Sequence, residues 1–146
     1  RAPARAREYQ LLVGGESIRL AVASIGNPHA VLRVDQIANA PVSRLGPAIE
    51  QHPDFPQRTN VGFAEITGRR HLRLRVWERG VGETRACGSG ACAAMAVYRD
   101  EGLVDDVVQV ELTGGVVEVN WPGTGTLHMR GPAETVFRGE IELAVP

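Results

Sequence analysis

Residues 89–101 read SGACAAMAVYRDE, and this stretch decides the fold class. Alanine and other good helix formers fill it, Ser89 is a suitable N-cap, and Gly102 follows as a helix stop. Small and apolar side chains lie on almost every side of the expected helix, whereas a surface helix has a polar face. The sequence therefore predicts a helix that is packed inside other structure.

Strand patterns flank this helix on both sides. Alternating or β-branched runs are joined by glycine turns, most clearly at residues 14–15 and 114–115. A short helix is expected over residues 42–49. The expected strands are residues 9–14, 16–24, 30–35, 61–67, 71–77, 107–113, 116–121, 126–130 and 134–143. We expect an α/β (α+β) fold in which mostly antiparallel strands form a barrel-like sheet wrapped around a central α-helix.

Composition limits the function classes. The chain has 146 residues, 43% of them hydrophobic, which fits a single domain over residues 1–146 with a sizeable core. The net charge of -1 with interspersed signs predicts no nucleic-acid partner. The short apolar runs and the lack of a signal-peptide core in residues 1–9 predict a cytoplasmic protein without a membrane span. All 16 basic residues are arginine, so this chain lacks the lysine of a pyridoxal phosphate Schiff base or a Walker A site.

A glycine-rich polar loop leads into the expected helix, and residues 77–92 read WERGVGETRACGSGAC. Cys87 lies just before the helix N-terminus, where unpaired N–H groups bind anions and favour a thiolate. Such a placement lowers a cysteine pKa from about 8.5 into a range of about 3.5 to 7.5, although burial acts in the opposite direction. Cys87 is therefore a candidate base or nucleophile. Cys92 lies about 140° further round the helix, so we interpret it as a packing residue.

Two other interpretations of this segment are weaker. Residues 88–93 match the dinucleotide pattern GxGxx(G/A), but nine residues separate Glu78 from Gly88, whereas the fingerprint should follow its strand directly. Cys87 and Cys92 have neither the CxxC spacing of a zinc or redox site nor enough partners for a disulfide framework. We therefore expect no metal site.

The longer run WERGVGETRACGSGACA, residues 77–93, resembles the second signature of diaminopimelate epimerases. Gly26-Asn27-Pro28-His29, followed by residues 58–61 (RTNV) and Phe63, resembles the GNPH and NV.F elements of that family in order and spacing. The resemblance covers roughly residues 8–144. It implies that the chain corresponds to the C-terminal domain of a two-domain epimerase. The N-terminal domain, with another cysteine in a CGNG-type motif, is absent from this chain.

The family interconverts LL- and meso-2,6-diaminopimelate without pyridoxal phosphate or a metal, so the resemblance implies no cofactor. Inversion at a carbon by two bases needs a proton acceptor on one face and a donor on the other. By resemblance, Cys87 is one of two catalytic cysteines, and His29 and Glu78 adjust the thiol acidities. The implied substrate-binding residues are Asn27, Asn60, Glu78, Arg79, Gly88 and Ser89.

The resemblance also implies a homodimer that acts on a small molecule in lysine and peptidoglycan-precursor synthesis. This chain alone is then expected to be inactive, because the second cysteine lies in the other half. In the family the last strand, around residues 137–143, can return to the other domain, so here it could be displaced or pair with another chain.

Three alternatives remain open at this point. One is a related cofactor-free racemase or isomerase that binds a different distal group at Glu78 and Arg79. The second is a cysteine hydrolase that uses Cys87 with His29, and the third is a non-catalytic ligand-binding or assembly domain.

Overall fold

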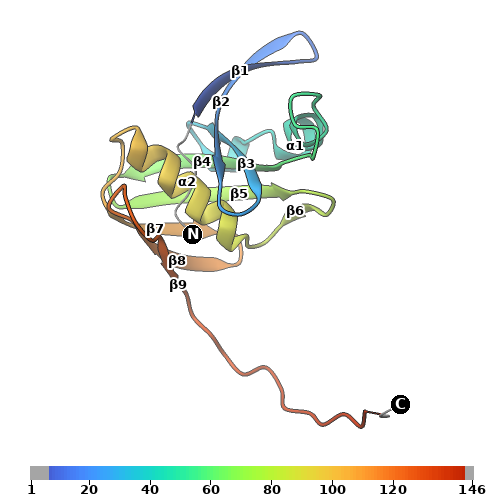
Figure 1. Cartoon of the computed structure of the whole chain (residues 1–146), viewed down its shortest axis with the longest axis vertical. Helices are drawn as coiled ribbons and strands as arrows, with labels where there is room; N and C mark the ends of the chain where they lie inside the picture. The colour runs from blue at the N-terminus through green and yellow to red at the C-terminus, as the bar shows by residue number, and fades with distance from the viewer. Residues whose placement is uncertain (1–6, 144–146) are drawn as a thin grey trace.

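The structure is a computed structural model that describes residues 7–143. Among these residues, nine strands form one mixed sheet in the order β1-β2-β3-β4-β5-β7-β8-β9, with β6 paired to β5 (Figure 1). The strands are β1 (Arg7–Val13), β2 (Glu16–Ser24), β3 (Pro28–Arg33), β4 (Asn60–Gly68), β5 (His71–Glu78), β6 (Gly82–Thr84), β7 (Val107–Leu112), β8 (Gly115–Asn120) and β9 (His128–Arg130). The helical elements are η1 (Ile37–Asn39), α1 (Val42–Glu50) and α2 (Gly88–Asp100). The expected domain also includes residues 1–6 and 144–146, which lie outside the described residues.

Two parallel strand pairs determine where the helices lie. Most neighbouring strands are antiparallel, but β3 pairs with β4 and β5 pairs with β7 in parallel. A parallel pair cannot be joined by a tight turn, so each needs a longer crossover connection. The first crossover contains η1 and α1, and the second contains β6 and α2. The position of α2 therefore follows from the parallel pairing of β5 and β7.

The sheet curves around α2, which lies across one of its faces (Figure 1). This helix contacts β2, β3, β4, β5, β7 and β8, and every residue from Gly90 to Tyr98 is buried. The burial on all sides that the sequence predicts is therefore observed, and the α+β class is confirmed. In the described part of the chain, β1 and β9 are the unpaired edges of an open sheet. Closure into a barrel is not observed.

Two apolar cores lie on opposite faces of the sheet, because side chains alternate along each strand. On β5 the buried residues Leu72, Leu74 and Val76 belong to the core around α2. On β4, Val61 and Phe63 belong to the core beneath α1. The alternation predicted for this hairpin is thus confirmed, and the hairpin separates the two cores.

The clearest turn prediction is confirmed, and one strand prediction is wrong. Gly14 and Gly15 form the β1–β2 turn with φ of 55° and 85°, a left-handed conformation that glycine adopts without a steric penalty. The predicted strand over residues 134–143 pairs with nothing in the described chain and trails away from β9 (Figure 1). Its apolar side chains are 77% to 92% exposed, namely Val136, Phe137, Ile141 and Leu143. The three-residue strand β6 was too short to predict.

Gly46 allows α1 to pack closely against β5. A Cβ atom at this position would lie 2.7 Å from Cγ of Trp77 and 2.8 Å from its Cβ. Both distances are shorter than any ordinary carbon contact. Glycine is a poor helix former, but at position 46 it is required by the packing of Trp77.

We expect Gly46→Ala to destabilise the chain, because the added methyl group overlaps the Trp77 side chain and overpacking costs about 1 to 3 kcal/mol. Helix propensity alone would favour alanine by about 1 kcal/mol, so a loss of stability identifies the overlap. The measurement is the urea midpoint of each variant. Gly68→Ala is the control, since its Cβ would have no atom within 4 Å. A more stable Gly46→Ala variant would contradict the packing argument.

Candidate active site

Cys87 is the residue at which the chain enters α2. Its extended backbone, with φ of -141° and ψ of 103°, makes it the N-cap, and its carbonyl oxygen accepts a hydrogen bond from Ala91 N at 3.0 Å. The amides of residues 88–90 come before this first helical bond, so the helix itself does not use them. The prediction that Ser89 is the N-cap is wrong by two residues, since Ser89 lies in the first turn.

Two glycines bring neighbouring groups close to the helix start. A Cβ at Gly90 would lie 3.0 Å from Cγ2 of Val76 and 3.3 Å from Sγ of Cys87. A Cβ at Gly88 would lie 3.0 Å from Cε of Met129. The lack of side chains thus keeps the thiol, β5 and β9 close to the first turn of α2.

The β2–β3 turn reaches this helix start through a chain of hydrogen bonds. Asn27 Nδ2 donates to Ser89 Oγ at 3.4 Å, and Asn27 Oδ1 lies 3.1 Å from His29 Nε2. Because an amide oxygen only accepts, His29 Nε2 is the donor in this contact. Ser89 Oγ in turn lies 3.7 Å from Cys87 Sγ. The asparagine and histidine of the GNPH element are therefore linked to the thiol.

Asn60 joins two of the motif segments and is 4% exposed. Its Nδ2 donates to the carbonyl oxygen of Pro28 at 3.0 Å, and its Oδ1 accepts from the backbone N–H of Arg79 at 3.0 Å. The Arg79 side chain donates from Nη1 to the carbonyl oxygen of Gln57 at 3.0 Å. Asn60 therefore fixes the distance between the GNPH element and the end of β5.

Glu78 lies half-buried at the end of β5 and accepts a hydrogen bond from Thr84 Oγ1 at 2.5 Å. The β5–β6 pairing places Glu78 opposite Gly82, so the short strand β6 returns the chain toward α2. Thr84 was not among the residues chosen from the sequence, although it lies inside the motif run. Its hydroxyl group orients the Glu78 carboxylate.

The electrostatics of Cys87 differ from the sequence-based expectation. Burial raises the pKa of the Cys87 thiol above its usual value, and the nearby Glu78 carboxylate raises it further. Hydrogen bonds from Ser89 and the Gly90 amide oppose this effect without cancelling it. The expected lowering of the pKa by the helix N-terminus is therefore wrong for this chain, because burial is the larger effect. The resting group is a thiol.

His29 is also uncharged at neutral pH. It is 1% exposed, and burial lowers its pKa to about 4, although Glu78 acts in the opposite direction. The imidazolium that could have stabilised a thiolate is therefore not formed. Among residues 7–143, the hydrogen-bond partner of the His29 ring is Asn27 and not Cys87, so the Cys–His pair of a hydrolase is not assembled.

Of the sequence-derived candidates, Asn27, Ser89 and Cys87 form a chain of contacts at the start of α2. Asn60 and Arg79 are hydrogen-bonded to each other, and Asn60 also contacts the β2–β3 segment at Pro28. The candidates come from the β2–β3 turn, the beginning of β4, the end of β5 and α2 itself. Cys92 belongs to the buried core around α2, as predicted, and burial raises its pKa to about 11. Residues 7–143 hold no cluster of three potential metal ligands, and none of their helices is long and apolar enough to cross a membrane.

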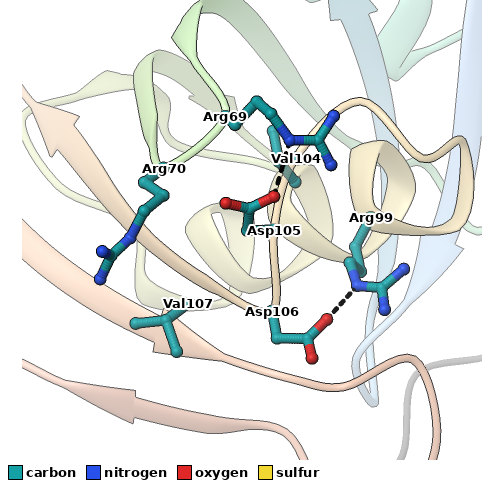
Figure 2. A pocket seen from close by; sticks show the side chains of 7 residues that line it. All are labelled: Arg69, Arg70, Arg99, Val104, Asp105, Asp106 and Val107. Atoms are coloured by element: carbon teal, nitrogen blue, oxygen red, sulfur yellow. Dashed lines mark hydrogen bonds and ion pairs between the residues drawn. The ribbon is translucent and has the colours of Figure 1, made fainter.

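A separate polar cavity of about 430 Å³ lies between the β4–β5 turn and the segment that follows α2 (Figure 2). Arg69 Nε pairs with Asp105 at 2.7 Å, and Arg99 Nε pairs with Asp106 at 2.5 Å. Arg70 points away from both pairs (Figure 2). None of the motif residues lines this cavity, and its ion pairs join neighbouring segments of the fold.

Solved structures of amino-acid isomerases share this fold. A hydroxyproline epimerase from Agrobacterium vitis with bound trans-4-OH-L-proline superposes with a TM-score of 0.61 at 22% identity, over 86% of this chain and 44% of that protein. A probable proline racemase from Agrobacterium radiobacter K84 with bound carbonate superposes with a TM-score of 0.55 at 22% identity. The match covers 79% of this chain and 42% of that protein. Both of these proteins are named as amino-acid isomerases, and this chain has the fold of part of each.

Sequence comparison identifies the family within this class. The family model described as diaminopimelate epimerase matches residues 21–136, and the chain belongs to that family. The diaminopimelate epimerase of Alkalilimnicola ehrlichii is 57% identical over 98% of this chain and 52% of that protein. The diaminopimelate epimerase of Halorhodospira halophila is 56% identical over 97% of this chain and 50% of that protein. The chain therefore spans about half the length of these relatives.

Proposed function

We propose that this chain is one half of a cofactor-independent epimerase that inverts an α-carbon with two cysteines, of which Cys87 is one. The observation that carries the proposal is a buried thiol at the unused amides of α2, in a chain of the diaminopimelate epimerase family. The amides of Gly88 and Ser89 bind the carboxylate of the amino acid. They also stabilise the negative charge that develops as the α-proton leaves.

The raised pKa of Cys87 supports a role as the proton donor. In a two-base inversion, a thiolate removes the α-proton from one face while a thiol gives its proton to the other. Cys87 supplies that proton, and the second cysteine, which lies in the half absent from this chain, is the base. In the reverse direction the roles exchange. Ser89 and the Gly90 amide then donate hydrogen bonds to the Cys87 thiolate.

The proposed substrate is 2,6-diaminopimelate, which is interconverted between its LL and meso forms. The Arg79 guanidinium suits a carboxylate, and the Glu78 carboxylate suits an ammonium group. Asn27 contacts Ser89 and Asn60 contacts the backbone of Arg79, and both side-chain amides can donate and accept. Glu78 lies close enough to Cys87 to raise the pKa of its thiol. His29 is linked to Cys87 only through Asn27 and Ser89, and we propose that it acts on the thiol along this path.

We further infer that the other half is an N-terminal domain and that the exposed tail of this chain packs against it. The support is the coverage of half of each relative and the alternation of Phe137, Ile141 and Leu143 along an extended segment. Such alternation places these side chains on one side of a strand. The complete enzyme is proposed to be a cytoplasmic homodimer in lysine and peptidoglycan-precursor synthesis.

The test is incubation of LL-diaminopimelate in deuterated water with this chain alone and with the chain supplied with its N-terminal half. We expect deuterium at one α-carbon and conversion to the meso form only when both halves are present. Turnover by this chain alone would overturn the two-cysteine account. If no deuterium enters the α-carbon with both halves present, the proposed epimerase is contradicted. A panel of mono- and dicarboxylic amino acids separates the proposed substrate from that of a related racemase.

A further inference from the structure

A buried carboxylate lies next to the turn that follows β5. Glu50 is the last residue of α1, and its side chain is 6% exposed. Its Oε2 accepts a hydrogen bond from Trp77 Nε1 at 2.8 Å, and its Oε1 accepts from the backbone N–H of Gly80 at 2.8 Å. Arg58 Nη1 lies 3.6 Å from the same Oε1. Both carboxylate oxygens are therefore used.

A carboxylate at this position is unfavourable without these partners. The C-terminal end of a helix carries a partial negative charge, which repels a carboxylate in the last turn. Burial alone would raise the pKa of Glu50, but the donors from Trp77 and Gly80, together with Arg58, lower it below its usual value. Glu50 is thus a buried anion that is held by specific contacts.

Glu50 and Asn60 hold two consecutive backbone N–H groups from different elements. Asn60, on β4, accepts from Arg79 N at 3.0 Å, and Glu50, on α1, accepts from Gly80 N at 2.8 Å. The peptide units on both sides of the Arg79 Cα are therefore fixed. Since Glu78 comes directly before them, the backbone of the Glu78–Arg79 pair depends on both acceptors.

The contacts of the Trp77 indole also restrain the end of β5. Gly46 and Glu50 are four residues apart and lie on one face of α1, where the first makes room for the indole ring and the second accepts its N–H. A Cβ at Gly82 would lie 3.8 Å from Cη2 of Trp77. The ring is therefore held between α1 and the start of β6, immediately before Glu78.

We propose that Glu50 is a positioning residue that holds Glu78 and Arg79 where they can bind the distal ammonium and carboxylate groups of the substrate. The inference rests on the proposed function and deepens it, because Glu50 acts on the same site through the backbone. Glutamine in place of Glu50 has nearly the same shape but only one acceptor oxygen. Its NH₂ group would face either the Trp77 indole N–H or the Gly80 N–H, and one of these two part-buried hydrogen bonds would be lost.

In the complete protein, we expect E50Q to raise the KM for diaminopimelate about tenfold and to leave kcat largely unchanged, because a lost hydrogen bond to a buried charge is of that size. The matched control is E65Q. Glu65 also accepts a backbone N–H, that of Ile37 at 2.9 Å, but it lies five residues beyond Asn60 on β4 and, in the described part of the chain, is not hydrogen-bonded to Glu78 or Arg79. We expect E65Q to leave the KM unchanged.

A second measurement tests the hydrogen bond between Glu50 and Trp77 without an activity assay. This chain contains only Trp77 and Trp121, so it contributes two indole N–H resonances when it alone carries the ¹⁵N label. We expect E50Q to shift the Trp77 resonance and to leave that of Trp121, which donates to Gly125 O at 3.3 Å, in place. Trp77→Phe keeps Glu50 and an aromatic ring but removes the N–H, and we expect a smaller rise in KM in the same direction.

The outcomes separate this inference from the proposed function. If the wild-type protein is active and E50Q leaves its KM unchanged, the role of Glu50 is overturned and the proposed function is not. An equal rise in the KM of E65Q would have the same consequence. If E50Q does not fold, an unchanged KM in Trp77→Phe overturns it. A complete wild-type protein without α-proton exchange would overturn the proposed function, and this inference with it, whatever the Trp77 resonance does.

Discussion

Cys87→Ala is expected to lower the rate of α-proton exchange by the complete protein by a factor of about 10² to 10⁴, the usual contribution of a general acid or base. The substitution removes one sulfur atom from a residue that is 6% exposed and leaves the backbone of the α2 N-cap unchanged. The chain should therefore stay folded while exchange is lost. The measurement is deuterium incorporation into diaminopimelate at saturating substrate.

Cys92→Ala is the matched control, because it removes the same kind of atom five residues further along the chain, inside the same helix. Cys92 lies in the apolar core around α2, so its loss should lower the free energy of unfolding and leave the exchange chemistry in place. A Cys87→Ala protein that exchanges protons at the wild-type rate would show that Cys87 is neither the general acid nor the general base.

Acidification from pH 7 to pH 4 is expected to destabilise the chain through His29. An unfolded histidine has a pKa of about 6.5, whereas burial lowers the pKa of His29 to about 4. Between these values the unfolded chain binds more protons, so the folded state loses stability as the pH falls and keeps this contribution above the unfolded pKa. Each pH unit in the interval contributes about 1.4 kcal/mol, and the full loss is about 3 kcal/mol.

The measurement is the free energy of urea unfolding at several pH values, compared with that of His29→Gln. Glutamine can donate to Asn27 as the imidazole does but has no titration in this range. Carboxylates titrate alike in both proteins, so the difference between the two curves isolates His29. If the curves stay parallel from pH 7 to pH 4, the neutral state of His29 is contradicted.

The sequence predicts those features of the fold that depend on neighbours along the chain. The hairpin at Gly14-Gly15 needs only a left-handed turn between two apolar runs, and both are visible in the sequence. The parallel pairs β3/β4 and β5/β7 depend on contacts between distant segments, and no local pattern encodes them. Residues 134–143 alternate as a strand does, but a strand needs a partner, and the described chain offers none.

In the candidate site, too, the sequence predicts what depends on neighbouring residues and misses what depends on distant contacts. The place of Cys87 at the start of a buried helix was predicted from the residues around it, and the N-cap differed by only two positions. The direction in which the pKa of Cys87 shifts could not be predicted, because it depends on burial in the folded chain. Glu50 was missed because a glutamate at a helix end is typical of a solvated surface. Its role becomes visible only when Trp77 and Gly80 are folded against it.

The burial of α2 on all sides also determines how well the sulfur of Cys87 is protected. Strands from opposite ends of the chain, β2 and β8, cover this helix together. Cys87 belongs to the same apolar core as buried residues of these two strands, so the burial that keeps it protonated depends on the sheet as well as on its own loop. Loss of either side of the sheet would admit water to the helix start, release more thiolate and expose the sulfur to oxidants and alkylating agents. Pairing of strands such as β2 and β8, far from Cys87 in the sequence, thus protects its sulfur from oxidation and alkylation.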